Sequence, residues 1–159
     1  MPTPTPVWPE RLISVVDVAS AVLVGTRDAQ LRPATARAYL ARRGERADEL
    51  LIFIRPAQAE QVAANLRDNG LVAVLLSVAL THETFQLKGR VIDIVDAPAS
   101  DEPLMRARLE QSCSEGERMG VPRRLVERLE HWPALVIRVK VEQIFRQTPG
   151  PGAGDRVLL

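Results

Sequence analysis

The stretch Leu71-Val-Ala-Val-Leu-Leu-Ser-Val-Ala-Leu80 decides the fold, because it is almost continuously apolar and other parts of the chain must cover it. Asn69 and Gly70 bound the run at its start, and its content of Val and Leu predicts a strand buried on both faces. After a short polar loop, the segment Phe85-Gln-Leu-Lys-Gly-Arg-Val-Ile-Asp-Ile-Val95 predicts a returning strand. The two strands should form an antiparallel hairpin.

The second strand of this hairpin begins with a regular alternation of apolar and polar residues. Successive side chains of a strand point to opposite faces, so Phe85 and Leu87 share one face, and Gln86, Lys88 and Arg90 share the other. A polar row beside a buried strand is either a solvated surface or a surface that faces a ligand. The alternation alone leaves both interpretations open.

The composition indicates a globular protein and excludes several functional classes. The chain has 159 residues, 46% hydrophobic and 26% charged, which suits a single domain over residues 1–159. A net charge of +1 and an aromatic content of 4% argue against nucleic acid or an anionic membrane as partner. The single cysteine excludes an internal disulfide, and two distant histidines without clustered carboxylates predict no metal site. Without a signal peptide or a membrane-spanning apolar run, the expected location is cytoplasmic.

The remaining segments predict further strands and helices around the hairpin. Apolar runs and turn residues predict strands over 20–26, 31–41, 50–54 and 134–145, and helices over 9–16, 56–69, 101–116 and 122–131. Because most strands follow one another through short turns, we expect an antiparallel sheet of six strands that closes into a small barrel. A flexible arm over 1–8, a helical insertion over 100–132 and a Pro/Gly tail over 147–159 complete the chain.

The order of these segments resembles the pyridoxamine 5′-phosphate oxidase-like, FMN-binding split β-barrel superfamily. The residues that carry the resemblance lie roughly between 13 and 94: Pro33-Ala-Thr-Ala-Arg37, Leu51-Ile-Phe-Ile-Arg55, Leu66-Arg-Asp-Asn-Gly70, Val72-Ala-Val-Leu-Leu76 and Phe85-Gln-Leu-Lys-Gly89. The resemblance implies a mainly β fold with flanking helices, a six-stranded antiparallel split β-barrel. It also implies a homodimer that holds FMN at its interface.

The resemblance further implies which residues bind the cofactor. Position by position, these are Arg37 for the flavin phosphate, Ile54 and Arg55 at a strand end beside the flavin, Gln86 toward the ring or the phosphate, and Gln61 on the short helix. Lys88 joins them because it lies on the same polar face as Gln86. The chain departs from the family at Gln61 and Val62, where the family carries a Ser and a basic pair, so the phosphate site has lost positive charge. The substrate-recognising residues of the oxidase have no match, and catalytic residues stay unassigned.

Physical chemistry gives several of these positions a rationale of their own. Arg55 precedes Pro56 at the start of a predicted helix, where unpaired N–H groups and the helix dipole favour a phosphate. Arg37 lies among alanines that leave room for a ligand. Donors such as Gln86 and Lys88 would stabilise negative charge on a reduced flavin ring. The alternatives are a surface arginine at 55, an interface ion pair at 37 and a solvated strand face.

Three functional hypotheses follow from the sequence. The first is a homodimeric flavoprotein, an FMN-dependent oxidoreductase that acts on an unknown small molecule. The second is a non-catalytic module on the same barrel that binds haem, another flavin-like cofactor or a partner protein. The third is a dimeric barrel without a ligand. The sequence leaves open whether the protein is an enzyme, and it names neither substrate nor electron donor.

Overall fold

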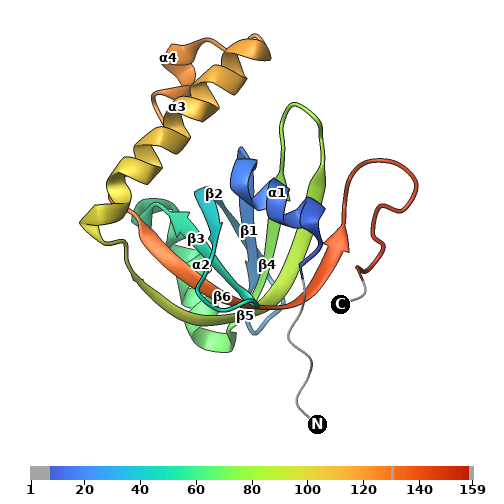
Figure 1. Ribbon diagram of the computed structural model, residues 1–159. Coiled ribbons are helices and arrows are strands. Elements are labelled where there is room, and N and C mark those ends of the chain that lie inside the picture. Colours follow the sequence, from blue (N-terminus) through green and yellow to red (C-terminus); the bar gives the residue numbers. More distant parts are fainter. Residues whose placement is uncertain (1–7, 130, 158–159) are drawn as a thin grey trace.

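Six antiparallel strands form a closed barrel in the order β1-β2-β3-β6-β5-β4 (Figure 1). The structure is a computed structural model that describes residues 8–129 and 131–157; most of the predicted arm and the end of the predicted tail lie outside these ranges. The strands are β1 (Ala21–Arg27), β2 (Pro33–Arg43), β3 (Glu49–Ile54), β4 (Leu71–Ser77), β5 (Thr84–Asp96) and β6 (Leu135–Arg146). The predicted six-stranded antiparallel barrel is therefore confirmed.

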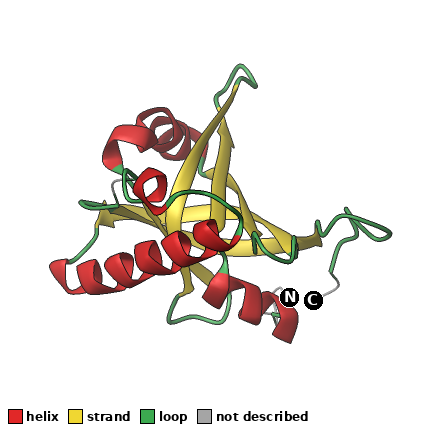
Figure 2. Cartoon of the chain, turned by 90° about the horizontal axis from the view of Figure 1, so that it is seen from above, coloured by secondary structure: helices red, strands yellow, loops and turns green. Residues whose placement is uncertain are grey.

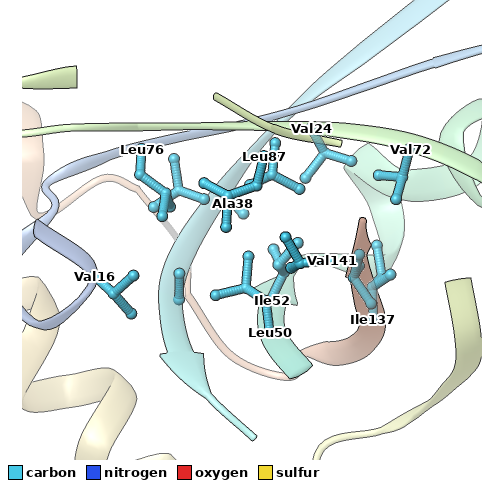
Figure 3. Packing of buried hydrophobic residues seen from close by; sticks show 14 of the residues in the cluster. Val16, Val24, Ala38, Leu50, Ile52, Val72, Leu76, Leu87, Ile137 and Val141 are labelled. Atoms are coloured by element: carbon cyan, nitrogen blue, oxygen red, sulfur yellow. The ribbon is translucent and has the colours of Figure 1, made fainter. Parts of the chain in front are cut away.

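The barrel interior holds the main hydrophobic core, because alternate residues of each strand point inward. Figure 3 shows this packing, with Val24, Ala38, Leu50, Ile52, Val72, Leu76, Leu87, Ile137 and Val141 from the strands and Val16 from the first helix. Each is at most 5% exposed. Fully burying one such aliphatic side chain contributes about 1.5–3 kcal/mol, so this shared interior is the main source of stability.

Two helices pack their apolar residues onto this same core. The helix α1 (Glu10–Val18) buries Leu12, Val15 and Val16. The helix α2 (Pro56–Asn69) has the predicted bounds, with proline at its first turn. It ends at Gly70, whose φ of 72° lies in the left-handed region that favours glycine.

The strand β4 corrects one prediction from the sequence. Its residues alternate strictly between buried side chains, such as Val74, and half-buried ones, such as Leu75. The prediction that this strand is buried on both faces is wrong for the single chain, because its outer row is only partly covered. The apolar run thus has one face in the core and one on the barrel surface.

The insertion between β5 and β6 forms the short turn η1 (Ala99–Asp101), the long helix α3 (Glu102–Arg118) and the short helix α4 (Arg123–Val126). The predicted helix over 122–131 is wrong beyond its first turn. Leu125 remains 46% exposed, so the apolar stripe that predicted a longer helix has little to pack against. In Figure 1, α3 runs away from the barrel and carries α4 beside its far end.

The helix α3 is anchored to the barrel at two places. Seen from above, α3 and α1 lie on the same side of the barrel (Figure 2). Arg108 donates hydrogen bonds to the carbonyl oxygens of Asp17 (2.7 Å) and Ala19 (3.4 Å) at the end of α1, where a cation is favoured by the helix dipole. One turn nearer the start of α3, Met105 packs into a second buried cluster outside the barrel, with Leu40, Phe53, Ala134 and Val136.

Candidate functional site

The outer face of β2, β1, β4 and β5 brings three of the predicted cofactor-binding residues together. One row of cross-strand neighbours runs from Arg37 through Leu23 and Leu75 to Gln86. Arg37 is exposed, Leu23 is 43% exposed, and Leu75 and Gln86 are half-buried. Since neighbouring strands lie about 4.8 Å apart, the backbone positions at the two ends of the row are roughly 14 Å apart. A polar group therefore stands at each end of an apolar floor.

A second row lies directly beside the first. It runs from Thr35 through Gly25 and Ala73 to Lys88, again one residue from each strand. Small residues in its centre leave a hollow of about 560 Å³ that both ends of the row help to line. Ligand sites commonly enclose about 300–1,000 Å³. A Cβ at Gly25 would meet only the Ala73 carbonyl oxygen, at 3.8 Å, so a larger side chain there would fill this hollow.

Arg37 and Lys88, the two predicted basic residues on this face, each make one side-chain contact to the described residues. The Nη2 atom of Arg37 donates a hydrogen bond to the Ser20 carbonyl oxygen at 3.1 Å. The Nζ atom of Lys88 lies 4.8 Å from the centroid of the Phe145 ring, within the range of a cation–π interaction. Both side chains are exposed, so both remain accessible to an anion or to a flat polar ring.

The predicted phosphate site at the start of α2 has a different geometry. Arg55 is half-buried, and its Nη1 atom donates to the Trp132 carbonyl oxygen at 2.7 Å. The first turn of α2 is exposed and has no side-chain cap. Tyr39, two residues after Arg37 on β2, donates from its hydroxyl to Gln58 in that first turn, at 2.9 Å. The start of α2 is therefore joined to β2, the strand that carries Arg37. Arg55 instead donates a hydrogen bond to the loop before β6.

The remaining two predicted residues lie outside both rows. The Ile54 side chain is fully buried in the barrel core, so only its backbone faces away from the interior. Gln61 is exposed on α2 and donates to Asn65 at 2.9 Å, which in turn donates to Thr26 at 3.0 Å. Gln61 thus supports the packing of α2 on β1 and is not brought to the floor between Arg37 and Gln86.

The helical insertion adds a residue that sequence reasoning did not place near the site. His131 lines one small void together with Arg37 and Tyr39. Burial lowers the pKa of the His131 imidazole below its ordinary value, and the positive charge of Arg106 lowers it further. The proximity arises because α3 packs beside β2, a long-range contact that no local pattern reveals.

Two features that would bear on function are absent from the described residues. Within residues 8–129 and 131–157, no group of three or more His, Cys, Asp or Glu side chains is arranged to hold a metal ion. In the same ranges, no helix combines the length and the apolar character needed to cross a membrane.

Comparison with known proteins identifies the fold. No family model matches the sequence, and no curated protein matches it. Among solved structures, HupZ of Group A Streptococcus has a TM-score of 0.56 at 16% identity, over 92% of this chain and 99% of that one. A putative pyridoxamine 5′-phosphate oxidase from Lactobacillus delbrueckii has a TM-score of 0.55 at 12% identity, over 87% and 93%. A pyridoxamine 5′-phosphate oxidase-related, FMN-binding protein from Nostoc punctiforme has a TM-score of 0.52 at 17% identity, over 91% and 86%.

These likenesses extend over 87–92% of the chain. The chain therefore has the split β-barrel fold that these solved structures share, as the order of its sequence segments predicts. At these identities the likeness establishes the fold, and the function must be argued from the site.

Proposed function

We propose that the protein is a homodimeric flavoprotein that binds FMN on the outer face of β2, β1, β4 and β5 and acts as an oxidoreductase on a small molecule. The observation that carries the proposal is the pair of cross-strand rows, which set Arg37 on one side of an apolar floor and Gln86 and Lys88 on the other. FMN combines a flat ring with an anionic tail, and such a face offers a complementary surface to each part. The FMN-binding protein from Nostoc punctiforme has the same fold.

The residues of this face suit the two ends of the cofactor. Arg37 carries a guanidinium that binds phosphate through paired N–H groups, and the exposed first turn of α2 offers backbone N–H groups nearby. Leu23, Leu75 and the small residues at 25 and 73 form a floor for a flat ring. Gln86 and Lys88 would donate to the ring and stabilise negative charge there, while bound FMN would supply the redox chemistry.

Exposed apolar side chains support the dimer. The outer face of an antiparallel sheet is ordinarily polar when it faces water, yet here Leu23 is 43% exposed and Leu71, Ala73 and Leu75 are only half-buried. Contiguous exposed apolar surface of this kind marks an interaction site. A second copy would cover this surface and enclose the cofactor between the two barrels, excluding water from the ring.

The test is a titration of the purified protein with FMN, followed by flavin fluorescence and by the visible spectrum after desalting. We expect saturable quenching and a retained flavin spectrum. Arg37→Gln should weaken binding roughly tenfold or more, because a charge-assisted hydrogen bond to phosphate is lost. Arg43→Gln, at the far end of the same strand, is the matched control and should leave binding unchanged. No saturable quenching in the wild type would reject the proposal.

A second candidate is a haem-binding module without catalysis. The observation that favours it is His131, a half-buried histidine beside Arg37 and Tyr39 whose lowered pKa keeps the imidazole neutral and able to bind iron. The missing charge at Gln61 points in the same direction, because it weakens a phosphate site. A Soret band after haem addition that His131→Ala abolishes, together with no response to FMN, would select this candidate over the flavoprotein.

A further inference from the structure

A second hollow lies on the far side of the barrel from the proposed flavin face. It occupies about 360 Å³ over the outer face of β2, β3 and β6, and its lining includes three arginines and two glutamates. In the barrel order, β3 lies opposite β4, and β6 lies opposite β1. The strands that form this hollow therefore place it away from the rows that contain Leu23 and Leu75. Its residues have no part in the function proposed above.

The register of three strands builds the centre of this hollow. Arg42 on β2 pairs across to Leu51 on β3, which pairs across to Arg138 on β6. Two guanidinium groups consequently rise on either side of one half-buried leucine. Their backbone positions are two strand spacings apart, roughly 10 Å. Arg43, the next residue on β2, adds a third guanidinium at the rim.

Most of the donors of these three arginines make no hydrogen bond to the described residues. Each arginine carries five N–H groups, yet the one hydrogen bond that they make to described residues is from Arg42 Nη2 to Asp101 Oδ2, at 3.2 Å. Arg138 Nε lies 3.7 Å from Glu49 and 3.6 Å from Asp93, which is too long for a hydrogen bond. Arg43 has no ion-pair partner in the described ranges. The lining thus carries three positive and two negative charges, and most of its guanidinium N–H groups make no hydrogen bond to the described residues.

Contacts within the protein fix the positions of Arg42 and Glu49 without a ligand. The Arg42 guanidinium lies 5.3 Å from the centroid of the buried Phe53 ring. The Glu49 side chain is 6% exposed and packs against Gly44, where an added Cβ would collide with it. Glu49 therefore provides a fixed acceptor beside Arg138. An anion that also carries a hydroxyl or amino group could use the arginines and this carboxylate together.

We propose that this hollow is a binding site for a small molecule that carries a phosphate or carboxylate group, separate from the flavin face. Forked guanidinium donors suit both oxyanions. Leu51 offers an apolar floor to the carbon skeleton of such a molecule, and the volume limits the ligand to the size of a small metabolite. The site stands whether or not the protein binds FMN, because it shares no residue with the two rows.

The test is isothermal titration of the purified protein, preincubated with FMN and desalted, with inorganic phosphate and separately with succinate at low chloride. We expect saturable binding of at least one probe, and the probe that binds identifies the oxyanion. Arg43→Gln and Arg138→Gln should each weaken binding roughly tenfold or more. Arg43→Gln changes an exposed side chain without an ion-pair partner among the described residues, so it keeps the test valid if Arg138→Gln unfolds the protein.

A control variant separates this site from other sources of binding. Arg124→Gln changes an exposed arginine of α4 that lies outside both proposed sites, so it should leave the titration unchanged. No saturable heat from either probe would overturn the proposal. So would binding that Arg124→Gln removes, or binding that survives Arg43→Gln and Arg138→Gln at full affinity.

Discussion

Both outer faces of the barrel carry large apolar side chains, but the described residues bury only one of these two sets. On the side of β3 and β6, Phe53 is fully buried and Met105 is 1% exposed, because the segment that begins α3 lies over the strands. On the side of β1 and β4, Leu23 is 43% exposed and Leu75 is half-buried. No helix within the described residues packs over that pair as Met105 packs over Phe53.

The difference teaches that strand composition alone does not tell a second core from a binding face. Both faces carry large hydrophobic residues on outward positions, and what separates them is whether another part of the chain reaches them. Apolar surface that the chain itself buries adds to stability. Apolar surface that it leaves open is available to a cofactor or a second copy. Each prediction below tests one side of this comparison.

The largest effect is expected where the chain covers its own sheet. Phe53→Ala should lower the free energy of unfolding by about 3–5 kcal/mol, because it leaves a cavity in the second buried cluster. Leu23→Ala, the matched change on the open face, should cost less than about 1 kcal/mol in the monomer, because this side chain is already partly hydrated. Urea denaturation of dilute protein measures both. Equal losses would contradict the distinction between the two faces.

The next effect concerns assembly through the open face. Leu75→Arg should raise the dimer dissociation constant roughly 100-fold, because two copies of an unpaired charge would enter the interface. Far-UV circular dichroism should stay the same, since this side chain does not face the core. Leu125→Arg, at another exposed leucine, should leave assembly intact. Sedimentation velocity measures the dissociation constant, and a dimer that tolerates Leu75→Arg would place the interface elsewhere.

A smaller effect is expected for the second row of the open face. Lys88→Gln should weaken FMN binding roughly fivefold, because it removes one exposed charge but keeps a donor at the same position. Lys140→Gln, at an exposed position of β6, is the control and should leave FMN affinity unchanged. Fluorescence titration measures both. Identical affinity in the two variants would show that the polar row of β5 faces solvent and not the ligand.

The smallest effect is expected from pH at the edge of the open face. Because burial and Arg106 lower the pKa of His131, the unfolded chain binds the proton more tightly than the folded one. The neutral His131 side chain therefore makes its full contribution to stability above the unfolded pKa of about 6.5. This contribution declines as the pH falls from about 6.5 toward the pKa of His131 in the folded protein. His131→Gln should flatten this decline in thermal melts between about pH 7.5 and 5.5. An unchanged slope would assign the decline to other groups.

The carboxylates titrate in a separate window, which keeps that measurement interpretable. Hydrogen bonds lower the pKa of Asp28, chiefly from the Arg32 backbone, and of Glu110, chiefly from Arg123. Stability from such groups is present above their unfolded pKa values, near 4, and is lost only as the pH falls below them. The loss of stability from these carboxylates therefore falls at a lower pH than the decline that His131 causes.

Much of the fold could be predicted from local signals. Apolar runs with their turn residues located all six strands, and the proline and glycine at its ends located α2. These local signals gave the wrong result where tertiary packing determines the length of a helix or the burial of a strand face. The stripe at Leu125 predicted a helix that lacks a partner surface, and the outer row of β4 seemed buried because a continuous apolar run does not show which face is covered.

The candidate site divides in the same way. Alternation placed Gln86 and Lys88 together, because the period of two is a property of any strand. It could not reveal that Leu23 lies between Arg37 and Leu75, since that order depends on which strands pair. Neither His131 beside Arg37 nor Arg138 across from Arg42 has a local signal. Both arise from segments about one hundred residues apart.

The sequence by itself therefore determined the strands and the two faces of β5, one apolar and one polar, because these follow from period and composition within a few residues. Only the tertiary structure decided that the outer rows of β1 and β4 stay open, that Phe53 and Val136 are covered by the start of α3, and that Arg42 and Arg138 lie on either side of Leu51. The physical reason is that the sheet closes into a barrel. When six strands pair around a ring, the register between them places distant residues side by side, and no local pattern encodes that register.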